Sequence, residues 1–327
     1  MKKRVLVTGA GGFIGSHLTE ELVKKGYNVR AMVRYNSHNN WGWLETLPEE
    51  ILDNIEIFAC DICDPFMVKK SIIGCKMVFH LAALIPIPYS YLAPASFVNT
   101  NILGTLNVLQ ACLAEGVERL VHVSSSETYG TAQYKPINES HPIVGQSPYA
   151  ASKIAADKLA ESFHRSFNLP LTIARPFNTF GPRQSARAVI PTIISQVLSG
   201  TNTIRLGHLQ SVRDFSYVKD TANGIIAVGE SSDVLGEEIN LGRGEGISIG
   251  NLAKMILDIC RSSAEIEFDE QRARPQNSEI FELICDTSKA KTLLGWQPKY
   301  SFSMGLEETV EWLKDNSNLY KADIYNI

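Results

Sequence analysis

The chain has 327 residues, of which 44% are hydrophobic and 20% charged, and its formal net charge is -4 at pH 7. This length suits one large domain or two closely packed domains with a sizeable core, and the composition excludes wholesale disorder. Mild acidity without any basic run argues against a nucleic-acid surface, which needs clustered Lys and Arg. We therefore expect no nucleic-acid partner.

The N-terminal segment M-K-K-R-V-L-V-T-G starts with basic residues, but its apolar run stops at Gly9. That run is too short for a signal peptide, and no stretch approaches the roughly 18 apolar residues of a membrane helix. We expect a cytoplasmic protein that binds no membrane. The six cysteines form no disulfide framework, and the C-x-x-C of Cys60 and Cys63 lacks a second ligand pair, so we predict no metal site.

Short apolar runs alternate with helical stretches along the first half of the chain. The run 4–8 precedes a glycine-rich turn and an amphipathic stretch that ends near Gly26, a strand-turn-helix pattern. Helices are expected over 101–115 and from Pro148 onward. Alternation of this kind predicts an α/β fold: a doubly wound parallel sheet of Rossmann type with helices on both faces. Its further strands are expected in the runs 28–34, 55–61, 77–83, 119–125 and 171–175.

The regular alternation of apolar runs and helical stretches ends after Arg175. There P-F-N-T-F-G-P-R-Q reads as a loop, and the later elements are shorter and of mixed type. We therefore predict a first domain of residues 1–175, joined by about 217–244 and parts of the C-terminus. Residues 176–216 and 245–315 are predicted to form a smaller mixed α/β lobe. No flexible linker separates the two parts, so a cleft between them is the expected ligand site.

Three glycines, Gly9, Gly12 and Gly15, follow the first predicted strand as G-x-x-G-x-x-G and enclose Phe13 and Ile14. Without side chains the backbone can turn tightly and approach a pyrophosphate, while the following helix N-terminus favours negative charge. The triplet lies between a strand and a helix at the start of the chain. This context predicts dinucleotide binding.

The second predicted strand ends at Arg34, where an acidic residue would hold the ribose 2′-hydroxyl of NAD. An arginine can instead face the 2′-phosphate of NADP or stack on adenine. The residue type therefore favours NADP modestly, although Asn36 and Ser37 suit a free ribose. Asp61, after the third strand, is placed to reach the adenine edge.

Tyr149 and Lys153 lie four residues apart in S-P-Y-A-A-S-K, on one face of the helix that starts at Pro148. A tyrosine with a pKa of about 10 is a poor base at neutral pH, but a neighbouring ammonium favours the phenolate. We expect Lys153 to supply that charge and to bind the nicotinamide ribose. The pair predicts proton transfer at a cofactor.

The fifth predicted strand runs into S-S-S-E, residues 124–127. Side chains alternate across a strand, so Ser125 and Glu127 point to the same side if the extended conformation continues that far. The pattern would place a hydroxyl and a carboxylate in one space.

These motifs together resemble the extended short-chain dehydrogenase/reductases, in the NAD-dependent nucleotide-sugar epimerase and dehydratase group. The similarity runs nearly the full length, through T-G-A-G-G-F-I-G-S-H-L, H-L-A-A, N-T-N-I-L-G-T, S-S-S-E-T-Y-G, Y-A-A-S-K, R-P-F-N-T-F-G-P-R and V-R-D-F-S-Y-V. Y-N-S-H-N-N-W-G-W-L-E, I-P-Y-S-Y, G-T-A-Q-Y and P-R-Q-S-A-R-A-V-I-P-T further resemble 4,6-dehydratases of the legionaminic and pseudaminic-type nonulosonic acid pathways. The narrower resemblance implies NAD, against the tendency from Arg34. Further cofactor contacts are expected at Ile62, Leu81, Ala82 and Ala83.

The resemblance implies roles for further residues. Ser125 would assist Tyr149, and Glu127 would remove a proton from C5 of a 4-keto sugar. Many glucose-nucleotide dehydratases have aspartate at the position of Ser126, whereas guanosine-sugar dehydratases have serine, so Glu127 would serve as both base and acid. Arg183 is a weaker candidate for the substrate diphosphate. The expected substrate-binding residues are Tyr89, Ser90, Ser126, Asn178, Arg187, Arg213 and Arg274.

The expected activity is 4,6-dehydration of UDP- or GDP-linked N-acetylglucosamine, or a derivative, to a 4-keto-6-deoxy sugar. Three alternatives stay open: an oxidoreductase acting on a preprocessed 5,6-unsaturated UDP-sugar, a UDP-sugar 4-epimerase, and a non-catalytic NAD-binding regulator. The helix over 101–115 and the one from Pro148 are expected to pair with their counterparts in a homodimer.

Overall fold

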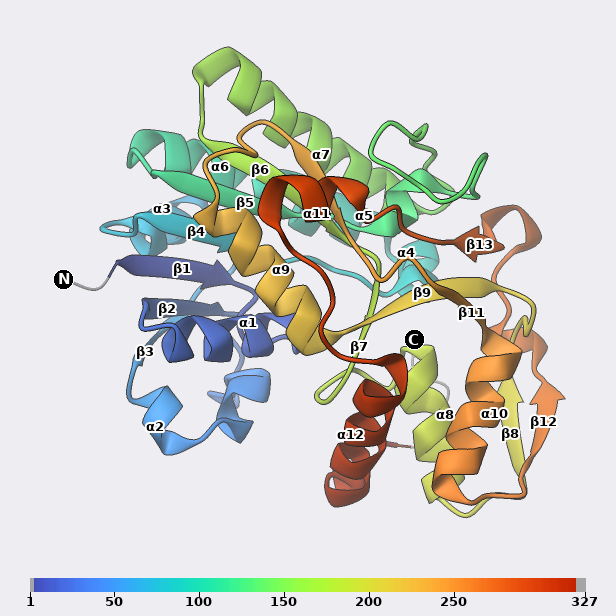
Figure 1. The fold of residues 1–327 in the computed structure, drawn as a ribbon. Helices are drawn as coiled ribbons and strands as arrows, with labels where there is room; N and C mark the ends of the chain where they lie inside the picture. The colour runs from blue at the N-terminus through green and yellow to red at the C-terminus, as the bar shows by residue number, and fades with distance from the viewer. Residues whose placement is uncertain (1–2, 322–327) are drawn as a thin grey trace.

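The computed structural model describes residues 3–321, so the first two residues of the predicted first domain lie outside the described part. Its centre is a seven-stranded sheet in the order β10-β6-β5-β4-β1-β2-β3, in which every pairing is parallel (Figure 1). The predicted Rossmann-type fold is confirmed. The strands are β1 (Arg4–Thr8), β2 (Asn28–Val33), β3 (Ile55–Ala59), β4 (Met77–His80), β5 (Arg119–Val123), β6 (Leu171–Pro176) and β10 (Glu238–Leu241).

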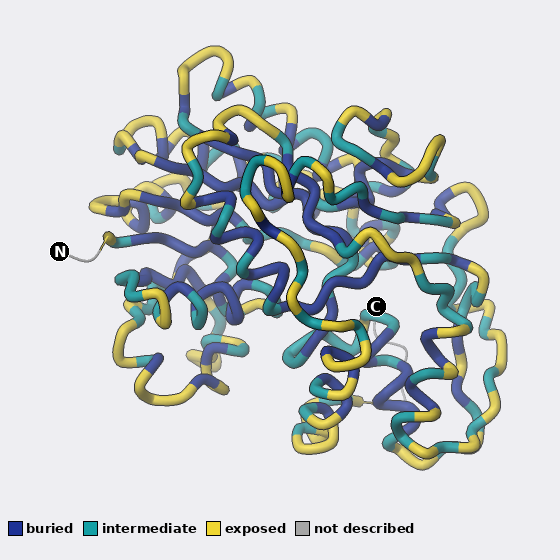
Figure 2. The backbone as a smooth tube through the Cα atoms, viewed as in Figure 1, coloured by how far each residue is buried: buried dark blue, intermediate teal, exposed yellow. Residues whose placement is uncertain are grey.

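Helices cover both faces of this sheet because its strands are apolar on both sides. One hydrophobic cluster joins the sheet to α1 (Phe13–Lys24), α9 (Val218–Glu230) and α11 (Ser288–Leu294). A second cluster joins the opposite face to the helices α3 (Pro65–Ile72), α6 (Gly104–Ala114) and α7 (Pro148–Phe167). Figure 2 shows the strands as a dark, buried layer between helices whose outer turns are exposed.

The later part of the chain builds a smaller group of elements around a separate hydrophobic cluster. Its helices are α8 (Val189–Leu198), α10 (Ile249–Cys260) and α12 (Phe302–Asp315). A parallel pair is formed by β8 (Thr203–Leu206) and β12 (Glu265–Phe268). Strand β9 (Val212–Tyr217) pairs with β7 (Asn178–Phe180), β11 (Gly246–Ser248) and β13 (Glu282–Leu283).

Helix α7 begins where the sequence predicted. Ser147 caps its N-terminus by accepting a hydrogen bond from the amide of Ala150, Pro148 occupies the first turn, and Asn168 ends the helix in a left-handed conformation. The helix predicted over 101–115 differs, because α6 starts only at Gly104 and follows a π-helical segment, Val98–Leu103. Short helices α2 (Glu49–Leu52), α4 (Ile87–Leu92) and α5 (Pro94–Phe97), and 3-10 turns at Gly42–Thr46 and Ser126–Tyr129, fill the loops.

Within residues 3–321, none of the helices has the length and apolar character needed to cross a bilayer. The six cysteines, all in this range, are free thiols.

The glycine turn is constrained by close backbone approach. A Cβ on Gly15 would overlap the Gly9 carbonyl oxygen, because α1 packs directly against the turn. Gly15→Ala should therefore lower the free energy of unfolding by about 1–3 kcal/mol and abolish NAD binding. Urea unfolding and NAD titration measure the two effects. The control is Gly250→Ala in α10, where a Cβ meets its nearest neighbour, Leu209, at 3.5 Å. Equal stability of the two variants would contradict the argument.

Candidate active site

The residues predicted to bind the cofactor lie at the carboxyl ends of four adjacent strands. Gly9 follows β1, Arg34 follows β2, Asp61 and Ile62 follow β3, and Leu81 follows β4. Since β4, β1, β2 and β3 are neighbours in a parallel sheet, these ends share one edge (Figure 1). Parallel α/β sheets bind nucleotides at this edge.

The glycine turn fits a dinucleotide. Gly9 has a positive φ of 70°, and a Cβ there would lie 2.9 Å from the amide nitrogen of Ala82. Gly12 caps α1 without any side-chain hydrogen bond, and the first turn of α1 contains no acidic residue. The turn therefore offers bare backbone and an uncompensated helix N-terminus, which suits the pyrophosphate of NAD. Phe13 and Ile14 are partly buried against the core of the smaller lobe.

A loop after β2 packs on the same turn. The amide of Trp43 donates to the Gly11 carbonyl at 2.9 Å, and the indole of Trp43 packs edge-on against Trp312 of α12 at 5.5 Å. Asn36 and Asn40 brace the loop through hydrogen bonds to its own backbone. Arg34 is exposed at its start, and its charge acts on Cys63, two residues after Asp61.

The end of β5 differs from the simple extended prediction. The strand stops at Val123, Ser125 is still extended, and a 3-10 turn starts at Ser126. The alternation of side chains across an extended strand therefore ends before Glu127. Ser125 and Glu127 are neighbours because the Ser125 hydroxyl accepts a hydrogen bond from the Glu127 amide at 3.2 Å. Ser126 and Glu127 are buried.

Helix α7 presents Tyr149 and Lys153 to this strand end, and both side chains are buried. Tyr149 lies close enough to Ser125 and Glu127 for both to act on its pKa. The ammonium of Lys153 donates to the Val123 carbonyl at 2.7 Å. The structure thus brings the four predicted catalytic residues, Ser125, Glu127, Tyr149 and Lys153, into one place.

Burial opposes the charged forms of both Tyr149 and Lys153. Burial raises the pKa of Tyr149, the neighbouring Ser125 hydroxyl lowers it less, and the charge of Glu127 raises it further. Burial also lowers the pKa of Lys153 to about 8. Desolvation disfavours both charged forms. Burial thus favours the neutral phenol, and the phenolate stays a prediction for the complex with cofactor.

Glu127 was predicted to act as a base and Arg274 to bind the substrate, but the two side chains form an ion pair. Nη1 of Arg274 lies 3.1 Å from Oε2 of Glu127, and Nη2 lies 3.4 Å from Oε1. Burial lowers the pKa of Arg274, but the charges of Glu127 and Glu279 raise it more, so it lies above its ordinary value. Arg213 senses the same carboxylates and pairs with Glu279 at 3.5 Å. Two arginines and two glutamates thus form one charge cluster.

The remaining predicted substrate residues lie in different settings. Tyr89 is 38% exposed and packs on Phe97, which in turn packs edge-on against Tyr149. Ser90 is fully buried, and its hydroxyl donates to the Ile87 carbonyl at 2.6 Å, so it presents no group to a sugar. Asn178 has a buried side-chain oxygen that lacks a hydrogen-bond partner.

The two weaker candidates, Arg183 and Arg187, lie in the loop between β7 and α8. Arg187 is exposed in the loop before α8. Arg183 pairs with Glu20 of α1 at 2.9 Å, which ties the loop after β7 to the cofactor helix.

Sequence reasoning missed Glu279 and Tyr91. Ser211 donates to Glu279 at 2.8 Å, which fixes the carboxylate beside Arg213. The Tyr91 hydroxyl lies 2.5 Å from that of Ser278, and Tyr91 is a neighbour of Arg274. The spacing of Glu279, five residues after Arg274, gave no warning of this contact. The I-P-Y-S-Y segment did contain Tyr91, beside the Tyr89 and Ser90 that were chosen.

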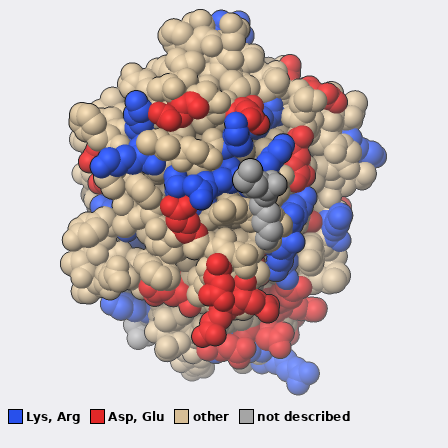
Figure 3. Space-filling model, turned by 90° about the vertical axis from the view of Figure 1, so that its left-hand side faces the viewer, with Lys and Arg blue, Asp and Glu red and all other residues tan. Residues whose placement is uncertain are grey.

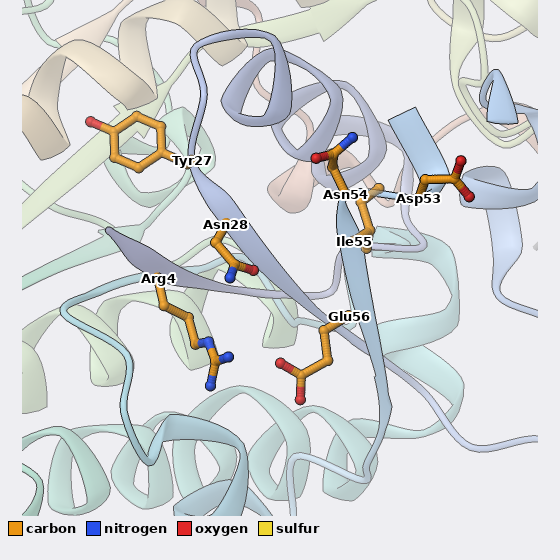
Figure 4. A pocket seen from close by; sticks show the side chains of 7 residues that line it. All are labelled: Arg4, Tyr27, Asn28, Asp53, Asn54, Ile55 and Glu56. Carbon is orange, nitrogen blue, oxygen red and sulfur yellow. The ribbon is translucent and has the colours of Figure 1, made fainter. Parts of the chain in front are cut away.

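A cavity of about 310 Å³ lies at the opposite edge of the sheet (Figure 4). It is lined by Arg4, Tyr27, Asn28 and the segment 53–56, near the amino ends of β1, β2 and β3. On that side of the molecule, basic and acidic groups lie next to one another (Figure 3). The cavity contains none of the predicted catalytic groups, and nucleotides bind at the other edge. We assign it no part in the chemistry.

The buried lysine gives a pH-dependent stability. Its pKa is about 8 in the folded protein against 10.5 ordinarily, so between these values the unfolded state binds more protons and stability rises with pH. The unfolding free energy of the protein minus that of Lys153→Met should therefore grow by about 3 kcal/mol from pH 7 to pH 11. Urea unfolding across this range measures it. A constant difference would show that Lys153 titrates normally.

Comparison with known proteins agrees with this geometry. A sequence model of the family described as GDP-mannose 4,6 dehydratase matches residues 6–309. A dTDP-glucose 4,6-dehydratase of Streptomyces niveus is 32% identical over 322 residues, which cover 96% of this chain and 93% of that protein.

Two solved structures extend the comparison. DesIV, a dTDP-glucose 4,6-dehydratase from Streptomyces venezuelae crystallised with NAD, has a TM-score of 0.87 at 29% identity and covers 97% of this chain and 99% of its own. The UDP-N-acetylglucosamine 4-epimerase from Methanobrevibacter ruminantium M1, in complex with UDP-N-acetylmuramic acid, has a TM-score of 0.86 at 33% identity, with 97% and 100% covered. The chain therefore belongs to the GDP-mannose 4,6-dehydratase family, a group of NAD-dependent nucleotide-sugar dehydratases and epimerases within the extended short-chain dehydrogenase/reductases.

Proposed function

We propose that the protein is a 4,6-dehydratase of a nucleotide-linked hexose. The observation that supports this most is the buried carboxylate of Glu127, which lies beside Ser125 and Tyr149 at the end of β5. Oxidation at C4 needs only the tyrosine, the serine and the cofactor. Removal of a proton from C5 needs an additional base, and we propose that Glu127 is that base.

The proposed chemistry divides between these groups. Tyr149, as the phenolate that the charges of Lys153 and of a bound nicotinamide would favour, takes the proton of the C4 hydroxyl with the assistance of Ser125. NAD held at the glycine turn of Gly9, Gly12 and Gly15 would supply the hydride acceptor for C4 and the hydride donor for C6. The C4 ketone acidifies C5, so Glu127 removes the C5 proton and transfers it to the departing C6 hydroxyl, which leaves as water. C5 then takes up one proton from solvent, and Tyr149 releases to solvent the proton that it received. The net change is the loss of one water.

Glu127 has to do both jobs because Ser126, buried beside it, is too weak an acid to protonate the C6 hydroxyl. We propose UDP- or GDP-linked N-acetylglucosamine, or a derivative, as the substrate, in the formation of legionaminic or pseudaminic-type sugars. This rests on the similarity of the loops around Trp43, Tyr89 and Arg187 to that group, and on the relative named a UDP-N-acetylglucosamine 4-epimerase.

The ion pair of Glu127 with Arg274 gives substrate binding a second role. Arginine binds phosphate oxygens through the same paired donors that it offers a carboxylate. A diphosphate carries more negative charge than Glu127, so it would draw Arg274 away and leave both carboxylate oxygens free. We propose that Glu127 becomes available as a base only when a nucleotide sugar occupies the site.

A UDP-sugar 4-epimerase is the second candidate, because one structural relative is an epimerase. Such a reaction needs no carboxylate at position 127. We further propose a homodimer in which α6 and α7 pack on their counterparts in a second copy, since Leu103 and Leu113 at the ends of α6 are exposed apolar side chains.

Solvent labelling tests the reaction class. The protein is incubated with UDP- and GDP-N-acetylglucosamine in deuterated water, and the products are examined by NMR. Deuterium at C5 together with loss of the C6 hydroxyl is expected for the dehydratase. An epimerised sugar without label would favour the 4-epimerase, and label at C5 without water loss would show proton exchange without elimination and contradict the dehydratase.

Glu127→Gln is the matched variant for this experiment. It keeps the shape of the side chain but removes the base, so water loss should slow by at least about 100-fold. Tyr149→Phe should stop both oxidation and water loss. Unchanged turnover by Glu127→Gln would exclude the proposed dehydration.

Nucleoside diphosphate binding tests the exchange at Arg274. Arg274→Met should weaken binding of UDP or GDP by about 10- to 100-fold, because a paired donor is lost. Glu127→Gln should bind the same ligand more tightly, because its amide no longer competes as an anion. Isothermal titration calorimetry measures both.

Arg272→Met serves as the control, since Arg272 pairs with Asp269 at 3.0 Å on the same segment. Its affinity for the diphosphate should match that of the unaltered protein. If Arg272→Met weakens binding as much as Arg274→Met, the effect belongs to the segment rather than to the paired guanidinium.

A further inference from the structure

A buried charge network lies behind the catalytic residues, and no step of the proposed reaction uses it. Its centre is Asp157 of α7, which is 0% exposed. One oxygen, Oδ1, lies 3.0 Å from Nε2 of His122. The other, Oδ2, accepts from the Ser124 hydroxyl at 2.5 Å and from Nη2 of Arg175 at 2.9 Å. Burying a carboxylate costs free energy, and hydrogen bonds and an opposite charge such as those around Asp157 offset that cost.

Asp157 and Lys153 both contact the carboxyl end of strand β5. Asp157 follows Lys153 by four residues, so both lie on one face of α7. Lys153 donates to the carbonyl of Val123, while Asp157 contacts the residues on either side of it, His122 and Ser124. Asp157 and Lys153 thus contact three consecutive residues, 122–124, at the end of β5.

We propose that Asp157 is a positioning residue for the C4 oxidation: its negative charge keeps Lys153 protonated and holds it against the end of β5, beside Tyr149. This inference rests on the proposed function for its catalytic consequence. Its structural part, the control of the charge on Lys153, is independent of which sugar reacts.

The histidines around Lys153 are neutral, so Asp157 supplies the negative charge that acts on the lysine. Burial lowers the pKa of both His122 and His80, so both are neutral and add no charge. His122 leaves Nδ1 without a partner, which fits a neutral ring that donates from Nε2 to Asp157. The titratable and charged groups that face Asp157 and Lys153 are Tyr149 on α7, His80 on β4, His122 on β5 and Arg175 on β6, with Glu238 on β10 behind Arg175.

Arg175 does not cancel this charge completely, because it has a second acid. Its Nη1 lies 2.6 Å from Glu238 and donates to the Tyr129 hydroxyl at 2.8 Å. Burial lowers the pKa of Lys153 to about 8, Asp157 raises it, and Arg175 lowers it by less than Asp157 raises it. Without Asp157, the lysine would face burial and a like charge together.

The test is the alkaline limb of the pH profile. In Asp157→Asn, the pH at which kcat/KM for the sugar nucleotide falls by half should move down by roughly one pH unit. Ser124→Ala is the matched control, because it removes one hydrogen bond to the same carboxylate but keeps the charge. The alkaline limb of the Ser124→Ala profile should stay within roughly 0.3 pH units of that of the unaltered protein. A uniform loss of activity in Asp157→Asn with an unmoved limb would overturn the proposal.

A second readout requires no turnover. The difference in urea stability between each protein and its Lys153→Met derivative follows the titration of Lys153. In the Asp157→Asn background this difference should rise at lower pH. If no nucleotide sugar is turned over but the curve shifts, the charge control stands and the proposed reaction fails. If Asp157→Asn does not fold, the paired variant Asp157→Asn, Arg175→Met removes both charges together, and the curve should again move to lower pH. An unshifted curve in a folded variant overturns the inference.

Discussion

The position of helix α7 against the end of β5 is the constraint on which the rest of the site depends. Lys153 is fixed by a backbone carbonyl of that strand, and Ser152 is fixed from the other side by Asn101, whose amide donates to its hydroxyl at 2.9 Å. Tyr149 then has one place to lie, beside Ser125. Because these contacts are buried and directional, a small rotation of α7 would leave several polar groups without partners.

The smaller lobe contributes charge rather than shape to this centre. Arg213 and Arg274 come from segments far along the chain, and each meets a carboxylate at close range. Two positive and two negative side chains are tolerated in a partly dry space because each is paired. An incoming anion meets donors that are already oriented, and it displaces a protein group rather than water alone. Binding and chemistry are therefore linked through a shared guanidinium.

Local spacing made much of this predictable. Gly9 to Gly15 and Tyr149 to Lys153 are separated by a few residues, so the helix period and the strand-turn-helix pattern determine their geometry. Contacts across long separations were not predictable: Glu127 meets Arg274 147 residues later. The 3-10 turn after Ser125 and the buried hydroxyl of Ser90 depend on packing that no periodicity shows. The raised pKa of Tyr149 follows from burial, which a residue pattern does not measure.

Trp43 and Trp312 join the glycine turn to the last helix of the lobe. Together they account for two of the four tryptophans of the chain. Indole emission shifts with the polarity around the ring, and the amide of Trp43 is tied to the turn beneath the dinucleotide site. The protein thus carries an intrinsic optical reporter at the contact between its two halves, so occupancy of the turn is readable from its fluorescence without an added dye.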